Sequence, residues 1–361
     1  MMQATMSSEQ VSVIESTLGH SGEVNMGIVG CGYWGPKLIR NFLNLPNVQL
    51  RLVADLRQER LDDIRTYFPT VNTTRDYREL LNSNIDAVTI ATPVHSHYPL
   101  AKAALLAGKH VLVEKPLTAR SDLAEELVEL AERCGLVLMV GHTFQYNAAV
   151  ESIREIVHSG QLGKLFYINS TRANLGLLQP DINVMWDLAP RDISILRYIL
   201  DQDPVSVSAR GATYVNTYRN LHEVVYLHLV FDEDVRANVH LSWLDPVKQR
   251  VVTIVGSQKM LVYNDINEHD SKVVIYDKGV DVPFYSVTEE EFRASYRHGE
   301  ATSYPLQWRE PLMVECDHFV HCIRNAAVPR SSGRDGLNVV KILETAQRSL
   351  QNGGVELKIE Y

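Results

Sequence analysis

The first 145 residues or so alternate short apolar runs with segments whose apolar residues recur at helical spacing. The run Val24–Val29 predicts a strand that ends in glycines, and residues 36–42 have helical spacing with a proline in the first turn. Further helices are predicted over 56–67, 75–81, 99–106 and 121–134, and further strands over 50–54, 85–91, 111–113 and 137–140. This alternation is typical of a doubly wound parallel sheet.

The pattern changes after Asn147 to one dominated by strands. Helices over 150–158 and 191–200 flank a strand over 165–170. Six more strand-like segments follow, over 205–209, 224–231, 237–243, 251–255, 260–263 and 272–276. These segments predict a large, mostly antiparallel open sheet in a second, α+β domain. Two helices, over 311–324 and 336–350, close the chain.

The composition agrees with a globular chain of two domains. Of 361 residues, 45% are hydrophobic and 22% charged, which is enough apolar material for two cores. The formal net charge is −9 and no basic stripe offsets it, so we expect no nucleic-acid partner. The four cysteines lack the CxxC spacing of a zinc or redox site. The sequence also contains no evident signal peptide or membrane-spanning segment. We therefore expect a cytoplasmic protein with reduced thiols and no metal.

Residues 30–35 read Gly-Cys-Gly-Tyr-Trp-Gly, a G-x-G-x-x-G motif between the first predicted strand and helix. Gly30, Gly32 and Gly35 permit the tight turn that brings a pyrophosphate to a helix N-terminus. Tyr33 and Trp34 lie in the same loop. The motif in this context predicts a Rossmann domain that binds a dinucleotide.

Asp55 ends the second predicted strand, 20 residues after Gly35. A carboxylate there accepts hydrogen bonds from both ribose hydroxyls and repels a 2′-phosphate, which favours NAD(H) over NADP(H). The alternative is that Asp55 only caps a helix beginning at Leu56. Arg57 nearby keeps NADP(H) open as a second cofactor.

Three later motifs occur in a set order: Thr-Pro-Val-His-Ser-His over 92–97, Glu-Lys-Pro over 114–116 and Trp-Asp-Leu-Ala-Pro-Arg-Asp over 186–192. Together with the glycine motif, they resemble the glucose-fructose oxidoreductase and inositol dehydrogenase (Gfo/Idh/MocA) family, from about Val24 to Leu350. The resemblance implies hydride transfer between a sugar carbon, often C3, and nicotinamide. It also implies a homodimer or homotetramer assembled through the open sheet.

Two further segments, Asn-Leu-Gly over 174–176 and Ser-Trp-Leu-Asp-Pro-Val-Lys over 242–248, are similar to one branch of this family. That branch acts on nucleotide-linked amino sugars and uronic acids. The expected boundaries are an N-terminal extension over 1–24, an NAD(P)-binding Rossmann domain over 25–146, and a substrate-binding and oligomerisation domain over 147–361. The last helices are expected to return to the first domain, and the extension is either disordered or packs on a partner subunit.

Lys115 is the first candidate for proton transfer. Pro116 holds it extended, and it follows a predicted parallel strand, at the edge where doubly wound sheets bind ligands. Its ammonium can hydrogen-bond the reacting oxygen, and burial beside an oxidised nicotinamide would lower its pKa.

Arg191 departs from the family pattern. The family usually reads Asp-x-Gly-x-His here, whereas this chain keeps Asp187 but places Ala189 and Arg191 at the other two positions. Arginine stays protonated, so it cannot act as a general base, but it can hold a carboxylate or phosphate. Three readings stay open. Arg191 binds an acidic substrate while Lys115 moves the proton, alone or with Tyr146 or His142; it pairs structurally with Asp187 or Asp192; or the protein binds ligands without redox chemistry.

The resemblance implies further site residues. The residues expected around the cofactor are Gly30, Gly32, Tyr33, Trp34, Gly35, Asp55, Thr92, Pro93, His97, Glu114 and Lys115. Those expected around the substrate are Lys115, Tyr146, Arg172, Asn174, Trp186, Asp187 and Arg191. Alternatives remain for three of them, since His97 or Asp187 can cap a helix and Trp186 can belong to the core.

The favoured interpretation is an NAD(H)-dependent dehydrogenase or ketoreductase acting on a nucleotide-activated pyranose, with Lys115, Asp187 and Arg191 as the catalytic set. One alternative is a sensor that binds sugar or cofactor without catalysis. Another is a redox-neutral sugar enzyme that keeps its NAD tightly bound.

Overall fold

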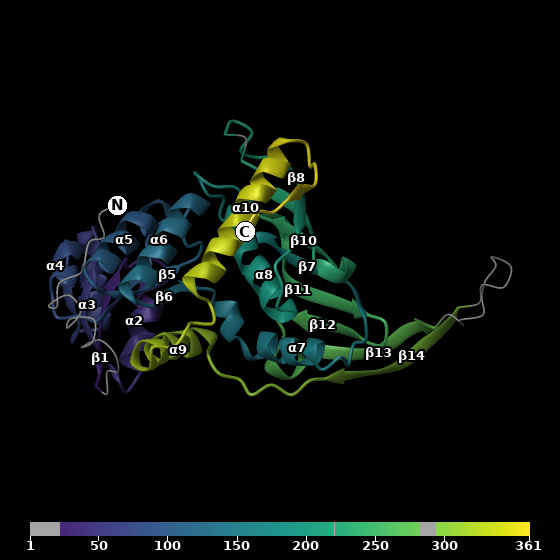
Figure 1. Cartoon of the computed structure of the whole chain (residues 1–361), viewed down its shortest axis with the longest axis horizontal. Coiled ribbons are helices and arrows are strands. Elements are labelled where there is room, and N and C mark those ends of the chain that lie inside the picture. Colours follow the sequence, from purple (N-terminus) through teal and green to yellow (C-terminus); the bar gives the residue numbers. More distant parts are fainter. Residues whose placement is uncertain (1–21, 220, 282–293) are drawn as a thin grey trace, which may run out of the picture. The chain divides into compact units, whose positions relative to one another are not determined.

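The computed structural model describes residues 22–219, 221–281 and 294–361. They form two compact units (Figure 1). The first takes the described residues up to Thr143 together with Glu310–Val340, and the second takes Phe144–Arg309 and Lys341–Tyr361. Most of the N-terminal extension expected over 1–24, and with it the expectation for its state, lies outside the described residues.

The first unit is built on a six-stranded sheet in the order β3-β2-β1-β4-β5-β6. Its strands are β1 (Val24–Val29), β2 (Val48–Ala54), β3 (Asn72–Thr74), β4 (Ala87–Ile90), β5 (His110–Glu114) and β6 (Leu138–Gly141). Every neighbouring pair is parallel, which confirms the predicted doubly wound sheet. The strand order reverses beside β1, so the loops after β1 and β4 flank the point where such sheets bind ligands.

Helices connect these parallel strands. They are α2 (Gly35–Leu43), α3 (Gln58–Tyr67), α4 (Tyr77–Leu81), α5 (His97–Leu106) and α6 (Ser121–Cys134). Apolar faces on α2 and α5 pack against the strands, because parallel sheets bury both of their faces. Helix α9 (Pro311–Asn325) comes from the far end of the chain and packs on α2.

The edge of this sheet at β6 is also covered by the end of the chain. Ser331 accepts a hydrogen bond from the Val140 N–H at 2.8 Å through its carbonyl, and its hydroxyl donates to the Val140 carbonyl at 2.7 Å. Ser332 forms an isolated bridge with Met139. Residues 310–340 therefore complete the first unit.

The second unit contains a nine-stranded sheet in the order β14-β13-β12-β11-β7-β10-β9-β8-β15. Its strands are β7 (Leu165–Leu175), β8 (Ser206–Ala212), β9 (Val224–Val230), β10 (Arg236–Ser242), β11 (Leu244–Gly256), β12 (Met260–Asn264), β13 (Val273–Asp281), β14 (Ser295–Ser303) and β15 (Leu357–Lys358). Among the described strands of this second sheet, only the β7–β10 pair is parallel, which confirms a mostly antiparallel sheet.

Helices cover one face of this sheet. Helix α7 (Ala148–His158) packs on α8 (Val184–Leu200), and α8 lies against β7, β9 and β10 (Figure 1). The strand residues facing α8, such as Val225, Leu227 and Leu241, are buried. Alternate residues on the same strands, such as Tyr226, point to the opposite, open face. Helix α10 (Gly333–Gln351) contributes residues to both units.

The predicted start of the helix at Arg191 is wrong. Helix α8 begins at Val184, because the Asn183 side chain accepts a hydrogen bond from the Trp186 N–H at 3.1 Å and caps the first turn. The motif over 186–192 therefore lies inside the helix, which continues through Pro190. The alternative of Asp187 as the N-cap is wrong for the same reason.

Candidate functional site

The glycine loop after β1 has no room for side chains at two of its glycines. Gly30 has a φ of +104°, and a Cβ there would lie 2.4 Å from the Ala91 carbonyl oxygen. A Cβ at Gly35 would lie 2.3 Å from the Gly30 oxygen. A Cβ at Gly32 would meet no atom within 4 Å, so this backbone faces open space. A tight turn with one open glycine suits the approach of a pyrophosphate.

Helix α2 starts directly from this loop. Its N-cap residue, Trp34, makes no side-chain capping bond, and Pro36 occupies the first turn. The first N–H groups of a helix need partners outside it and carry partial positive charge. The loop and helix start together fit the phosphates of a dinucleotide.

Asp55 is joined to the glycine loop. Its Oδ2 accepts from the Cys31 N–H at 2.7 Å, and its Oδ1 accepts from the Arg57 N–H at 2.9 Å. Helix α3 begins at Gln58, so a cap for a helix starting at Leu56 does not account for this carboxylate. A carboxylate oxygen has lone pairs beyond these two bonds. It is therefore held beside the loop with capacity to accept from ribose hydroxyls.

Two aromatic side chains mark the rim of the loop. The Lys37 ammonium lies 3.6 Å from the centroid of the Tyr33 ring, and the Tyr33 and Trp34 rings meet edge to face. Cys31, between the glycines, is buried, and burial raises the pKa of its thiol to about 12. Cys31 is therefore a packing residue of this loop and not a nucleophile.

His97 connects two of the predicted cofactor loops. Its Nδ1 lies 2.9 Å from the Pro116 carbonyl oxygen and its Nε2 lies 2.8 Å from the Thr92 carbonyl oxygen. The ring is 1% exposed, and burial lowers its pKa despite these two bonds. The Thr92 hydroxyl accepts from Ser96, which tightens the same loop. His97 thus holds the loop after β4 against the loop after β5, and its ring does not cap α5.

Lys115 follows the last residue of β5, at the carboxyl edge shared by the glycine loop and Asp55. The Lys115–Pro116 peptide is cis, and Lys115 is half-buried while Glu114 and Pro116 are buried. The structure thereby brings the predicted cofactor loops of the first unit together at one edge of its sheet.

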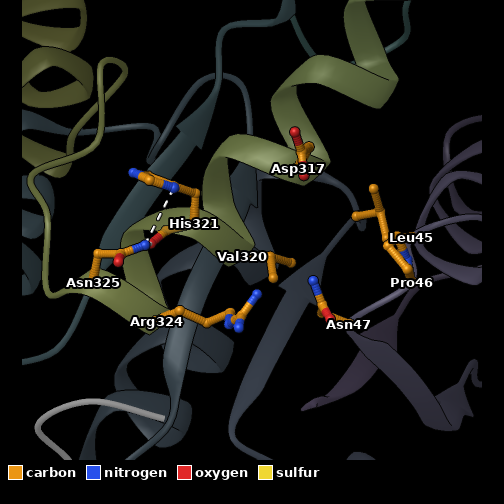
Figure 2. A pocket seen from close by; sticks show the side chains of 8 residues that line it. All are labelled: Leu45, Pro46, Asn47, Asp317, Val320, His321, Arg324 and Asn325. Carbon is orange, nitrogen blue, oxygen red and sulfur yellow. Dashed lines mark hydrogen bonds between the residues drawn. The ribbon is translucent and has the colours of Figure 1, made fainter. Parts of the chain in front are cut away.

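A separate small hollow of the first unit lies away from these loops. Figure 2 shows its lining, which comes from α9 and from the turn before β2 and encloses about 90 Å³. Asn47 precedes β2, so the hollow lies at the amino edge of the sheet, opposite the glycine loop. It is not the predicted cofactor site.

In the second unit, Asp187 lies in a polar cluster with residues of the neighbouring strands. Its Oδ2 accepts from the Trp243 Nε1 at 3.3 Å. A Cβ at Gly176 would lie 2.8 Å from Trp243 and 3.1 Å from the Asn174 amide nitrogen. Trp243 is 2% exposed, so the indole is a buried support that aims Asp187 and borders Asn174. No local sequence pattern predicts this hydrogen bond, because Trp243 and Asp187 belong to different elements.

Arg191 lies one helical turn after Asp187 and therefore shares its face of α8. Arg191, Asp187 and Trp186 are all half-buried. The Asp192 carboxylate is bound to Arg172 on β7, with Nε and Oδ2 2.5 Å apart. A permanent cation and a carboxylate thus lie side by side on one helix face.

Two predicted substrate residues are interior. Arg172 is buried, stacks 5.0 Å from the Phe144 ring and shares Asp192 with the Ser170 hydroxyl. Its guanidinium is committed to this buried ion pair, which accounts for it without a substrate. Tyr146 is 1% exposed and belongs to the core of the same unit.

Two other expectations concern metals and membranes. Within residues 22–219, 221–281 and 294–361, no group of three or more histidine, cysteine, aspartate or glutamate side chains is placed to hold a metal ion. No helix in these ranges is both long and apolar enough to cross a bilayer. All four cysteines are free thiols.

Comparison with known families matches most of the chain in two parts. The oxidoreductase family with an NAD-binding Rossmann fold, GFO_IDH_MocA, matches residues 24–142. The GFO/IDH/MocA C-terminal domain matches residues 150–262.

Individual proteins with known names are similar over nearly the full length. scyllo-Inositol 2-dehydrogenase (NAD(+)) of Bacillus subtilis is 22% identical, over 92% of this chain and 95% of that protein. The solved structure of UDP-N-acetylglucosamine 3-dehydrogenase GnnA of Acidithiobacillus ferrooxidans has a TM-score of 0.76 at 22% identity, covering 92% of this chain and 99% of that one. GenD2 from gentamicin A biosynthesis, in complex with NAD, has a TM-score of 0.78 at 22% identity, covering 94% and 97%.

Proposed function

The chain belongs to the Gfo/Idh/MocA family of oxidoreductases with an NAD-binding Rossmann fold, and from this premise we propose that it transfers a hydride between C3 of a nucleotide-activated pyranose and the nicotinamide of NAD(H). The observation that carries the proposal is the carboxylate of Asp55, bound to the Cys31 N–H inside the glycine loop at 2.7 Å. It joins the expected ribose partner to the expected phosphate loop.

The choice of NAD(H) over NADP(H) rests on this carboxylate. A 2′-phosphate next to it would suffer like-charge repulsion, whereas ribose hydroxyls can donate to it. The Arg57 Nε lies 3.4 Å from the Asp55 Oδ1, so the Arg57 guanidinium forms an ion pair with Asp55. GenD2, whose solved structure holds NAD, shares the fold of this chain.

Lys115 is proposed to hold and move the proton of the reacting hydroxyl. When bound, the nicotinamide accepts the hydride from the sugar carbon or returns it. The Lys115 amine accepts the hydroxyl proton as the carbonyl forms, and it donates that proton in the reverse direction. Pro116 and the link from His97 to the Pro116 carbonyl fix the backbone that carries this amine.

Asp187 and Arg191 are proposed to bind and orient the sugar. Asp187, supported by the Trp243 indole, can accept from sugar hydroxyls, and Asn174 lies at the same cluster. Arg191 cannot take a proton, so it serves as a fixed cation for a carboxylate or phosphate of the substrate. This division leaves the proton to Lys115 alone.

The nucleotide-sugar assignment draws support from the relatives. UDP-N-acetylglucosamine 3-dehydrogenase is 29% identical over 52% of this chain and 58% of its own length. The permanent charge of Arg191 favours an anionic substrate over a neutral inositol. A nucleotide-linked sugar carries phosphates, and a uronic acid adds a carboxylate.

We also propose that copies of the chain assemble through the open face of the nine-stranded sheet. This face carries a groove of about 470 Å³ whose lining includes Asn169, Arg210 and Asn238. The Tyr226 and His240 rings stack there, 4.6 Å apart. Such a face, uncovered on one side of a large sheet, suits a second copy of the same chain.

The test is to incubate the purified protein with NAD⁺ and a panel of UDP- and dTDP-linked pyranoses, with free sugars and inositols for comparison, and to follow NADH absorbance near 340 nm. We expect NADH with at least one nucleotide sugar, lost in Lys115→Met. NADH only with free sugars would contradict the substrate class. Tightly bound nucleotide with no net NADH would instead indicate a redox-neutral enzyme.

A further inference from the structure

A buried carboxyl group on α9 has no role in the site described so far. Glu315 is 1% exposed. Its Oε2 accepts from the Thr143 hydroxyl at 2.9 Å, while its Oε1 meets no hydrogen-bond donor among the residues the structure describes. A charged carboxylate with an unsatisfied buried oxygen is costly, so this geometry suits an uncharged acid.

A second buried carboxyl group lies close to the first. Glu114, the residue before Lys115, is 8% exposed and interacts electrostatically with Glu315. Gly141 on β6 packs against it, and a Cβ there would lie 3.3 Å from the Glu114 carboxyl carbon. Glu114 is also paired in register with Gly141, two residues before Thr143, so both carboxyls lie at the carboxyl ends of β5 and β6.

The charge of this pair depends on pH. Burial raises the pKa of Glu315 well above its usual range, and the neighbouring Glu114 carboxylate raises it further, against the lowering effect of the bond from Thr143. Cys316 beside it on α9 is buried, and its pKa is also raised, so it adds no charge. His142, the residue after β6, is buried, and its Nε2 lies 3.8 Å from the Asp335 carboxylate. Two nearby carboxyls that cannot both ionise share one proton.

We propose that Glu315 is a positioning residue which, as the uncharged partner of Glu114, keeps a single negative charge behind Lys115 and so sets the proton affinity of the Lys115 amine. The proposal rests on the proposed function, in which that amine moves the proton. A carboxylate on the adjacent residue stabilises the ammonium form, and a second charge would stabilise it further. The protonated acid prevents that second charge at neutral pH.

The decisive measurement is the titration of the Lys115 amine itself. Lysines are reductively methylated with ¹³C, the Lys115 signal is assigned by its loss in Lys115→Arg, and its midpoint is read by NMR in the full-length protein. We expect Glu315→Gln to leave the midpoint within about 0.3 pH unit of the wild type, because the amide imitates the uncharged acid. The double variant Glu114→Gln with Glu315→Gln should lower it by about one unit, since no charge remains. Glu129→Gln, at an exposed carboxyl on α6, is the matched control.

Two results would overturn the proposal. An equal shift in Glu315→Gln and in the double variant would mean that Glu315 carries the charge. No shift in either would mean that the pair does not act on Lys115. This titration needs no substrate, so it can succeed or fail separately from the search for a sugar that yields NADH. If a substrate is found, the pH dependence of kcat/KM should shift between wild type and variants by the same amount as the titration midpoint of the Lys115 amine.

Unfolding supplies a measurement that does not depend on Lys115. A raised folded-state pKa contributes stability that is fully present below the unfolded-state value and is lost as pH rises through the folded-state value. The stability of the wild type should therefore fall relative to that of Glu315→Gln as pH rises above the ordinary glutamate pKa of about 4.3, until the folded-state pKa is reached. If the variant does not fold, infrared spectroscopy of the wild type tests whether Glu315 is protonated. We then expect the carbonyl band of a protonated carboxyl at pH 7 and its loss at alkaline pH. Absence of that band at pH 7 contradicts an uncharged Glu315.

Discussion

At the scale of single residues, Arg191 distinguishes this chain from the pattern of its family. A guanidinium replaces a group that can titrate, and it lies one turn from Asp187 on α8. A side chain that stays charged can orient an anion but cannot pass a proton. In the proposed function, proton transfer therefore falls to Lys115.

Arg191→His should leave the Kd for NAD(H) within about twofold of the wild type, because Arg191 belongs to the second unit and the glycine loop to the first. We expect turnover to fall and the pH profile of kcat to gain a new limb near the ordinary histidine pKa of about 6.5. Fluorescence titration of NADH and initial rates between pH 5.5 and 9 measure the two effects. Arg197→His, at an arginine of the same helix that pairs with Asp203, is the control. Unchanged rates and an unchanged profile would make Arg191 structural.

Asp55→Ala should weaken NAD(H) binding and narrow the preference for NAD(H) over NADP(H). Hydrogen bonds to a charged group contribute about 1.5 to 3 kcal/mol, which corresponds to a loss of about tenfold or more in affinity. NADP(H) should lose less, because the variant also removes the repulsion of its 2′-phosphate. Titration of both reduced cofactors against wild type and variant gives the two ratios. Asp62→Ala, on the exposed side of α3, controls for the removal of a negative charge. A preference that does not change contradicts the role of Asp55.

At the scale of secondary-structure elements, α8 carries the predicted substrate residues and depends on its first turn. The Asn183 side chain caps the helix and also donates to the Gln347 side chain at 2.9 Å. The first turn presents Trp186 and Asp187. Its order therefore decides where Asp187 points.

Asn183→Ala should lower the free energy of unfolding by about 1 kcal/mol, the typical cost of losing an N-cap, with a further loss from the bond to Gln347. Asn183→Asp keeps an accepting oxygen at the same position and should retain most of that stability. Urea denaturation followed by circular dichroism compares the three proteins. Equal stability of the alanine and aspartate variants would mean that the cap contributes little.

The sequence predicts helices and strands well where hydrophobic periodicity is strong. It predicts them poorly where polar contacts determine the bounds of an element. Strand β1 and helix α6 have the predicted bounds, because apolar runs or helical spacing define both ends. The early start of α8 was not predicted, since it depends on a capping bond and on a helix that continues through Pro190. Strand β14 was not predicted either. Its residues 295–303 lack an apolar alternation, and it is ordered by pairing with β13.

The same contrast holds for the candidate site. The glycine motif and Asp55 could be predicted because their spacing along the chain is fixed by one βαβ unit. The bonds from Trp243 to Asp187 and from Arg172 to Asp192 join residues of different strands and helices, so no local pattern announces them. The buried pair with Asp192 accounts for Arg172 without a substrate, and only the tertiary structure shows this pair.

At the scale of the whole molecule, the open face of the nine-stranded sheet is the proposed surface for assembly. Tyr226→Glu would place a charge in the middle of that face, opposite the His240 ring on the next strand. We expect a shift toward monomer in light scattering after size exclusion at micromolar concentration, because a buried unpaired carboxylate at an interface is costly. Val328→Glu, at an exposed position of the first unit, is the control. A wild-type protein that is monomeric in this measurement contradicts the proposal.

The split composition of the first unit has a consequence for how the protein is made. Ser331 and α9, which complete the β6 edge and pack on α2, leave the ribosome only after strands β7 to β14 of the second sheet have been synthesised. Until then the nascent parallel sheet has an unpaired strand edge and an uncovered helix, which are surfaces prone to misassociation. The cofactor-binding unit, although encoded first, is thus completed only after most of the second unit has been synthesised, and its exposed surfaces need protection during that time.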